Sequence, residues 1–125
     1  MNSKEIGNYG EKITAFYLEK KGYKIIGRNY CIRGGEIDII AVKDDVIAFV
    51  EVKTRTIDSV ADGFEAVTKS KKKLIIKTAA AYSYKNPHNY QPRFDVVSII
   101  LDNKKVAGFN YIENAFDATD CKIIF

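Results

Sequence analysis

The chain has 125 residues, of which 46% are hydrophobic and 29% are charged, and these proportions suit one globular domain over residues 1–125 with no second domain. The apolar runs are far shorter than the roughly 20 residues that span a bilayer, and the first five residues do not begin a secretory signal, so we expect a cytoplasmic protein. The formal net charge of +4 is compatible with a polyanionic partner.

A helix over residues 3–21 is the first predicted element, and Gly22 is a suitable residue to end it. A strand begins at residue 23, and strands over residues 36–42 and 46–53 then form an antiparallel hairpin. The positions that recur at helical spacing in the first helix are Ile6, Gly10, Ile13 and Tyr17.

The second half of the chain adds one helix and two strands. The helix is expected over residues 70–84, and Pro87 and Pro92 bracket the loop after it. Strands over residues 94–101 and 106–112 follow. Because the segment from the hairpin through this helix has the length of a crossover connection, we expect an α/β fold with a mixed central sheet flanked by helices. The expected buried stripe of the helix consists of Leu74, Ile75, Thr78, Ala79 and Tyr82.

Charged residues inside the two apolar hairpin strands are the most informative feature of the sequence. Each strand alternates with a period of two residues, so Glu36 and Asp38 share one face of the first strand. Glu51 and Lys53 share one face of the second strand in the same way. If positions 44–45 are the loop, paired residue numbers sum to 89, as 44 and 45 do. Asp38 then faces Glu51, and Glu36 faces Lys53.

Two carboxylates directly opposite each other repel and destabilise a sheet unless a positive charge lies between them. A hard divalent cation fits this place, since Mg²⁺ is usually held by one or two carboxylates together with water and substrate phosphate. Lys53 adds a fixed positive charge near Asp38 and Glu51. Such an arrangement is suited to orienting a nucleophilic water and stabilising the charge that develops when a phosphodiester is attacked.

These residues resemble a known nuclease pattern. The spacing of Asp38, Glu51 and Lys53 is similar to that of the PD-(D/E)xK restriction-endonuclease-like superfamily. The whole chain more closely resembles the YraN-type family of predicted endonucleases, which is related in fold to archaeal Holliday-junction resolvases. The stretches that carry the resemblance span nearly the full chain and are residues 7–11, 28–30, 34–38, 49–55, 93–97 and 114–116.

The resemblance implies a restriction-endonuclease-like fold and an endodeoxyribonuclease that depends on Mg²⁺ or Mn²⁺. It further implies that Asp38 and Glu51 bind the metal. Lys53 is implied to assist catalysis, and Glu11 to lie close to the site. The implied partner is DNA, including branched DNA such as a four-way junction, and symmetric cutting of two strands suggests a homodimer.

Two acidic residues have more than one interpretation. Glu11 follows Gly10 in the first helix, where each glycine costs about 0.5–1 kcal/mol relative to alanine, so this helix either packs closely or approaches a ligand. Glu11 itself either packs against the sheet or reaches the metal through water. Glu36 either pairs with Lys53 or contacts the metal, directly or from an outer position.

Other polar residues are assigned structural or unremarkable roles. Asp95 lies in an apolar strand with Arg93 on the same face, and a structural ion pair explains both residues. His88 is expected to be solvated, with no sign of a general base beside it. Cys31 and Cys121 lack metal-ligand spacing and are expected to be reduced thiols.

Basic residues near the predicted site favour contacts with DNA phosphates. Lysines concentrate in residues 69–77, and arginines flank the approach to Asp38. Taken alone, the lysines suit a solvated helix face equally well, but beside a carboxylate pair phosphate contacts are the better interpretation. The predicted nucleic-acid-binding residues are Arg28, Arg33, Arg55, Lys69, Lys71, Lys72 and Lys73.

The sequence therefore predicts a metal-dependent DNA endonuclease. Two other classes stay open: a nucleic-acid-binding module that keeps a nuclease fold without turnover, and a protein-interaction domain in which the charged pairs form a structural network. Metal binding separates the last class from the other two, and DNA cleavage separates the first two.

Overall fold

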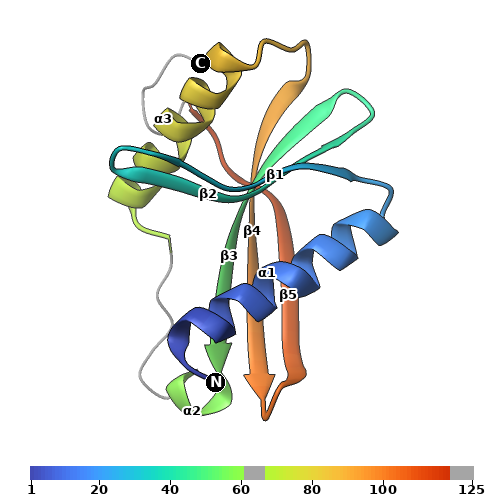
Figure 1. Ribbon diagram of the computed structural model, residues 1–125, viewed down its shortest axis with the longest axis vertical. Helices are drawn as coiled ribbons and strands as arrows, with labels where there is room; N and C mark the ends of the chain where they lie inside the picture. Colours follow the sequence, from blue (N-terminus) through green and yellow to red (C-terminus); the bar gives the residue numbers. More distant parts are fainter. Residues whose placement is uncertain (61–66, 119–125) are drawn as a thin grey trace.

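A five-stranded mixed sheet with helices on both faces forms the described part of the chain, which is residues 1–60 and 67–118 of the computed structural model (Figure 1). The elements are α1 (Ser3–Lys20), β1 (Lys24–Ile32), β2 (Gly35–Lys43), β3 (Val46–Thr56), α2 (Ile57–Val60), α3 (Lys69–Lys85), β4 (Gln91–Asp102) and β5 (Lys105–Phe116). The strand order is β1-β2-β3-β4-β5, in which only β3 and β4 pair in parallel, and α3 lies in the crossover between them. The predicted α/β class is confirmed, and the topology is consistent with a restriction-endonuclease-like fold.

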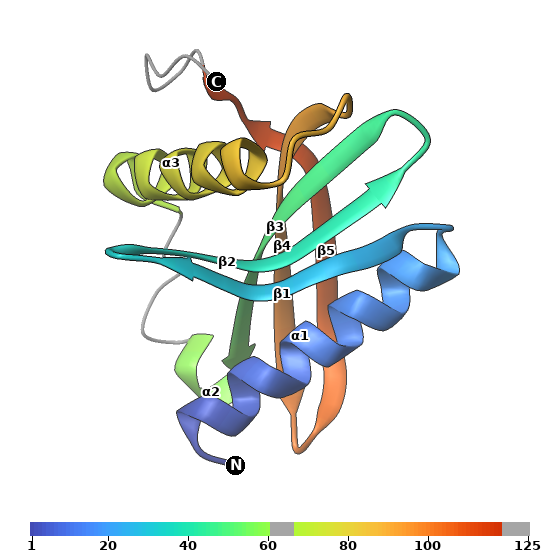
Figure 2. The same cartoon turned by 45° about the horizontal axis from the view of Figure 1, so that its top comes forward.

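Each face of the sheet packs against one long helix, with α3 and α1 on opposite sides of the β1–β2 hairpin (Figure 2). Leu18 of α1 is fully buried and packs in a cluster with Val50 and Val97. On the other face, Ile76 of α3 is fully buried and packs in a cluster with Phe49. No helix within residues 1–60 and 67–118 has both the length and the apolar character needed to cross a membrane.

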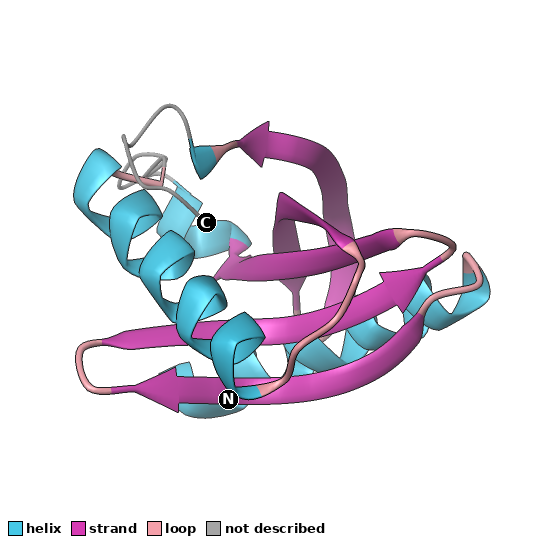
Figure 3. Cartoon of the chain, turned by 90° about the horizontal axis from the view of Figure 1, so that it is seen from above, coloured by secondary structure: helices cyan, strands magenta, loops and turns pink. Residues whose placement is uncertain are grey.

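The sheet is strongly twisted, so that β1 and β2 cross the later strands at a steep angle (Figure 1, Figure 3). This twist limits how far simple alternation holds along β2. Ile39 packs in the cluster beneath α1, whereas Ile37 packs in the cluster beneath α3, although a period of two would place both on one face. Side chains near the start of β2 are therefore directed toward α3.

The β2–β3 hairpin has the predicted register. Positions 44–45 form the loop, and the ladder runs from the Lys43–Val46 pair to the Ile39–Val50 pair. Every pair in this ladder sets an apolar side chain of one strand against an apolar side chain of the other, except at the loop itself. The hydrophobic pattern thus fixes the register even though the loop lacks the glycine that two-residue turns favour.

Several observed elements differ from those predicted. β4 begins at Gln91, so Pro92 lies in the strand and not at the end of a loop; a proline is tolerated near the start of a strand. β5 extends to Phe116, past the predicted end at residue 112. The short helix α2 was not predicted.

Cys31 is an exposed free thiol, as predicted, and Cys121 lies outside the described residues.

The buried face of α3 differs from the predicted stripe at two positions. Leu74 is 44% exposed, whereas Ile76, which was not predicted to be buried, is fully buried. The apolar face of a helix that covers a sheet is more than 100° wide, so a neighbouring position outside the strict repeat can still face the core. The predicted members that are buried or half-buried are Ile75, Thr78, Ala79 and Tyr82.

Gly10 allows α1 to approach β3 closely. It is buried, and a Cβ atom at this position would overlap the side chain of Thr54, including its Cβ atom at 2.8 Å. Gly7, one turn earlier in α1, has no atom within 4 Å of such a Cβ. Close packing, one of the two reasons considered for the glycines, therefore accounts for Gly10 and not for Gly7.

Gly10→Ala is expected to lower the free energy of unfolding by about 1–3 kcal/mol, because the added methyl group pushes α1 away from Thr54. Gly7→Ala is the matched control and should raise it by about 0.5–1 kcal/mol, since alanine is the better helix former and meets no neighbour. Urea unfolding of the two variants and the parent measures both effects. Equal stabilisation by the two substitutions would contradict the close contact between α1 and β3.

Candidate functional site

The two predicted metal-binding carboxylates lie where β2 and β3 leave their common ladder. The ladder ends at the Ile39–Val50 pair, so the prediction that Asp38 and Glu51 pair directly within it is wrong. Asp38 instead turns its side chain toward β3, where its Oδ2 accepts a hydrogen bond of 2.7 Å from the backbone N–H of Val52. The separation of the strands at this point gives the carboxylates room that a regular ladder would not leave.

A groove of about 650 Å³ contains these carboxylates. Its lining residues come from the end of β1, the start of β2, β3 and the N-terminal half of α3. Gly35 brings the hairpin close to α3, because a Cβ atom at this position would overlap Oγ1 of Thr78 and lie 3.3 Å from the carbonyl oxygen of Leu74. The charged residues that line the groove are Glu36, Asp38, Glu51 and Lys71.

Asp38 carries a carboxyl group that resists ionisation. Burial raises its pKa, and the negative charge of Glu51 raises it further, while the hydrogen bond from Val52 N–H acts in the opposite direction. The net result is a pKa of about 7. A positive charge beside Asp38 would therefore favour its ionised form, because it would offset both burial and the repulsion from Glu51.

Glu51 is bound by a lysine from the opposite side of the groove. Lys71 Nζ lies 2.7 Å from Glu51 Oε1, and the two side chains are 45% and 7% exposed. Burial acts to lower the pKa of Lys71, but the hydrogen bond to Glu51 and its charge outweigh burial, and the pKa is raised. Sequence reasoning placed Lys71 with the DNA-binding residues and missed this contact, since no local pattern links a residue of α3 to one of β3.

Lys53 lies on the same strand as Glu51 and beside Lys71. Its pKa is lowered, first by burial and then by the positive charge of Lys71. Glu51 acts in the opposite direction. Among the ion pairs of residues 1–60 and 67–118, none joins Lys53 to Glu36, so the predicted facing of these two residues is wrong and Glu36 is exposed.

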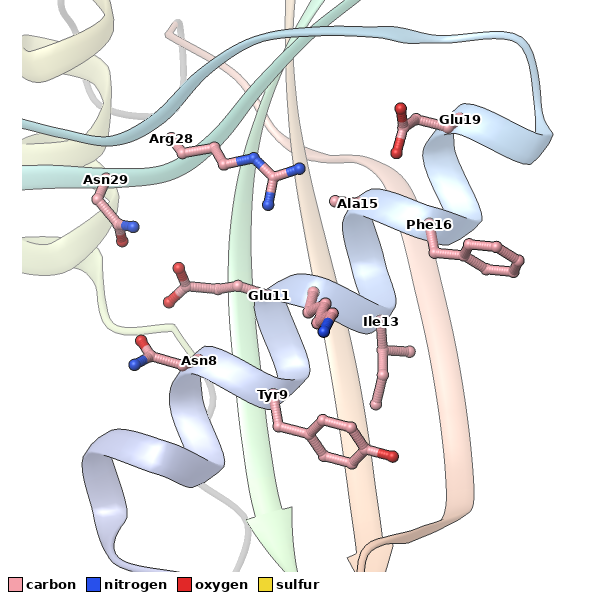
Figure 4. Close-up of a pocket in the computed structure, with 10 residues that line it drawn as sticks. Asn8, Tyr9, Glu11, Ile13, Ala15, Phe16, Glu19, Arg28 and Asn29 are labelled. Atoms are coloured by element: carbon pink, nitrogen blue, oxygen red, sulfur yellow. The ribbon is translucent and has the colours of Figure 1, made fainter.

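Glu11 lines a neighbouring groove, about 710 Å³ in volume, between α1 and β1. Its side chain extends from α1 toward Arg28 and Asn29 of β1 (Figure 4). The pKa of Glu11 is raised by burial, and a hydrogen bond with Asn29 opposes this, while the charges of Glu36 and Glu51 raise it further. Glu11 is thus close enough to sense the carboxylates of the site, although it belongs to an adjacent groove.

The donor set available to a metal ion consists of two carboxylates. No group of three or more Asp, Glu, His or Cys side chains in the described part of the chain is arranged to hold one ion, and Glu11 lines the adjacent groove. Oδ2 of Asp38 accepts the hydrogen bond from Val52 N–H, and Oε1 of Glu51 contacts Lys71 Nζ. The other carboxylate oxygen of each residue takes no part in these two contacts. Two carboxylates completed by water suit Mg²⁺ or Mn²⁺.

The predicted DNA-binding residues divide into different environments. Of the three adjacent lysines of α3, Lys71 contacts Glu51, Lys72 lies over the ring of Phe116 at 5.7 Å, and Lys73 is exposed. The remaining members are Arg28 on β1, Arg33 in the β1–β2 turn, Lys69 at the start of α3, all three exposed, and the half-buried Arg55 on β3. The lysines of α3 therefore do not act as one uniform surface.

Asp95 forms a buried hydrogen-bond network outside the groove. Arg93 donates to it from Nε at 2.9 Å and from Nη2 at 2.8 Å, as the predicted ion pair requires. Tyr111 OH donates at 2.6 Å, and the backbone N–H of Asn114 donates at 2.9 Å. The carboxylate of Asp95 is fully satisfied by these donors, so its role is to join β4 to β5.

His88 is held by two neighbours, which corrects the expectation that it is solvated. Its Nδ1 accepts a hydrogen bond of 3.1 Å from the backbone N–H of Tyr90, and its Nε2 lies 2.9 Å from Ser83 Oγ. Because Nδ1 accepts, the neutral ring carries its proton on Nε2 and donates to the serine. His88 thus fixes the turn after α3.

Comparisons with known proteins agree along nearly the whole chain. A family model described as uncharacterised protein family UPF0102 matches residues 10–99. A UPF0102 protein of Caldanaerobacter subterraneus subsp. tengcongensis is 45% identical over 119 residues, which cover 93% of this chain and 98% of that protein. UPF0102 proteins of Alkaliphilus metalliredigens and Clostridioides difficile are 47% and 46% identical, covering 91% and 93% of this chain and 99% and 100% of those proteins. The chain therefore belongs to the UPF0102 family, the YraN-type family that its motifs indicated.

Proposed function

We propose that this protein is a metal-dependent endonuclease of the PD-(D/E)xK superfamily that hydrolyses phosphodiester bonds in DNA, with branched or otherwise structured DNA as its substrate class. The observation that carries this proposal is the Asp38–Glu51 carboxylate pair, which shares one groove with Lys71 and has Lys53 beside it. Buried carboxylates close together without enough countercharge are costly for folding alone, and they are typical of sites that bind a cation.

Asp38 and Glu51 are the residues that would hold Mg²⁺ or Mn²⁺. The raised pKa of Asp38 fits this role, since its causes are burial and the charge of Glu51, both of which a bound cation would offset. When bound, the ion supplies Lewis-acid activation of the phosphate and a more acidic water.

The other side chains of the site would act on the DNA. Lys53 places a positive charge beside Glu51, where it stabilises negative charge that develops on the attacked phosphate. Glu36 is exposed at the rim of the groove, where it suits an outer position around the metal. Arg28 and Arg33, which both precede Asp38 in the chain, are exposed and suited to bind phosphates near the cut.

Cleavage of labelled DNA tests the proposal. Duplex, single-stranded, flap and four-way-junction substrates are incubated with the protein and Mg²⁺ or Mn²⁺, with EDTA as the metal-free control. We expect metal-dependent cleavage, highest on a branched substrate. DNA binding without cleavage of any substrate would instead favour the non-catalytic nucleic-acid-binding module, and neither binding nor cleavage would favour the protein-interaction domain.

Asp38→Asn should separate metal binding from stability. The amide oxygen keeps the hydrogen bond from Val52 N–H, while the repulsion from Glu51 disappears. We therefore expect the substitution to raise the stability of the metal-free protein at pH 7 by on the order of 2 kcal/mol, and to weaken Mn²⁺ binding at least tenfold. Calorimetric titration with Mn²⁺ and urea unfolding in EDTA measure the two effects.

The stability gain expected for Asp38→Asn should depend on pH. The folded-state pKa of Asp38 is raised, so folded protein holds a proton that the unfolded chain loses near pH 4. The contribution of Asp38 to stability is therefore fully present below pH 4 and is lost as the pH rises toward 7. The stability difference between the variant and the parent should grow over this window, and a difference independent of pH would contradict the assignment.

A further inference from the structure

The contact between Lys71 and Glu51 places a lysine ammonium where a cation would bind. Nζ lies 2.7 Å from Glu51 Oε1, one of the two carboxylates that the proposed metal site requires. The carboxylate of Asp38, the second group of the site, accepts its hydrogen bond from the backbone N–H of Val52 and not from Lys71. Lys71 thus supplies one positive charge to one side of a site that has two negative groups.

The exposure of the two partners shows which one is free to leave. The side chain of Glu51 is 7% exposed and fixed on the central strand β3, whereas that of Lys71 is 45% exposed. A long lysine near the start of α3 can turn its ammonium group into water and lose little, because water solvates the group again. The buried carboxylate has no such alternative, so it needs a cation at all times.

We propose that Lys71 is a built-in cation that competes with the divalent metal ion for Glu51 and thereby sets the metal affinity of the site. This inference rests on the proposed function, because it takes Asp38 and Glu51 as the metal ligands. In the metal-free protein, Lys71 protects the buried Glu51 charge. A divalent ion, which attracts both carboxylates at once, displaces the ammonium group and leaves Lys71 beside the groove.

The competition predicts an effect opposite to that of an ordinary site residue: removing Lys71 should strengthen metal binding. Lys71→Gln is expected to raise the affinity for Mn²⁺ about tenfold, because the ion no longer has to break a charge-assisted hydrogen bond to Glu51. Mn²⁺ titration followed by electron paramagnetic resonance, without DNA and at about 0.15 M ionic strength, measures the affinity directly.

Two further variants control for charge and for shape. Lys77→Gln removes the same charge from an exposed position on the same helix, and we expect less than a twofold change in Mn²⁺ affinity, since salt screens a distant charge. Lys71→Arg keeps a positive charge opposite Glu51, and its affinity should stay within about threefold of the parent. Thermal unfolding in EDTA and in Mn²⁺ adds a second measurement: Mn²⁺ should raise the melting temperature of Lys71→Gln more than that of the parent.

The outcomes distinguish this inference from the proposed function. Tighter Mn²⁺ binding by Lys71→Gln than by both the parent and Lys77→Gln supports it, including the case in which the parent binds too weakly to detect. If the parent binds Mn²⁺ and Lys71→Gln binds equally well or more weakly, Lys71 does not compete and the inference fails while the metal site stands. Absence of binding in the parent and in every folded variant would overturn the metal site and this inference together. If Lys71→Gln does not fold, an affinity of Lys71→Arg more than about threefold from that of the parent would overturn the inference.

Discussion

Lys53→Ala is expected to reduce DNA cleavage by about 10²–10³-fold while leaving the fold intact. This is the range observed when one electrostatic stabiliser of a transition state is removed from an active site. Lys53 lies beside Glu51, and burial and the charge of Lys71 lower its pKa, so its environment differs from that of a solvated surface lysine. The measurement is the single-turnover rate on the best substrate at saturating Mg²⁺.

The fold should tolerate this substitution for reasons visible in the structure. Lys53 is half-buried, and Glu51 keeps its ion pair with Lys71 when Lys53 is removed. Lys43→Ala is a suitable control, because Lys43 lies at the far end of β2, next to the hairpin loop, and its removal should leave the rate unchanged. Urea unfolding of both variants should stay within about 1 kcal/mol of the parent. A Lys53→Ala protein that unfolds would assign Lys53 a structural role, and a folded variant that cleaves at the parent rate would show that Lys53 does not assist catalysis.

The hairpin shows what the sequence can predict about the site. The register between β2 and β3 follows from matching apolar positions, and it is confirmed from the loop to the Ile39–Val50 pair. The charged residues that interrupt the apolar pattern mark the place where the ladder ends. Charged residues that interrupt a buried apolar pattern thus indicate where the site lies on the hairpin. The predicted direct pairing of Asp38 with Glu51 within the ladder was nevertheless wrong.

The contact of Lys71 with Glu51 shows what the sequence does not predict. Nothing in the residues around position 71 distinguishes it from Lys72 or Lys73, since all three belong to one run of lysines at the start of α3. The distinction arises from how α3 lies over the sheet, which directs Lys71 into the groove and Lys72 over Phe116. Which lysine enters the groove depends on how elements distant in the sequence pack together, and the local periodicity of the sequence carries no information about that packing.

The same limit explains the smaller differences. The helical repeat placed Leu74 in the core, but it lines the groove, where the edge of the sheet leaves it 44% exposed. His88 lacked an identifiable partner in the sequence because Ser83 meets it only after the chain turns at the end of α3. Asp95 was assigned correctly, since its main partner Arg93 lies two residues away on the same face of one strand.

Asp95→Asn is expected to destabilise the protein by about 3–5 kcal/mol, because it leaves the guanidinium of Arg93 half-buried without its charged partner. Arg93 also donates to Tyr23 OH at 2.5 Å, so the loss extends to the chain between α1 and β1. Burial, followed by the charge of Asp95, raises the pKa of Tyr111, which therefore remains a donor and depends on this acceptor. Urea unfolding in EDTA measures the loss.

The second carboxylate on the same arginine provides the control for Asp95. Glu113 Oε2 lies 3.9 Å from Arg93 Nη1, and its side chain is 63% exposed, so Glu113→Gln should cost less than about 0.5 kcal/mol. Asp95 pairs with Val50, next to Glu51 on β3, yet it lies outside the groove. The folded fraction of Asp95→Asn should therefore bind Mn²⁺ as the parent does. If fully folded Asp95→Asn binds Mn²⁺ more weakly than the parent, the Asp95 network positions Glu51. If its free energy of unfolding is within 1 kcal/mol of that of the parent, Asp95 does not need its charge to join β4 to β5.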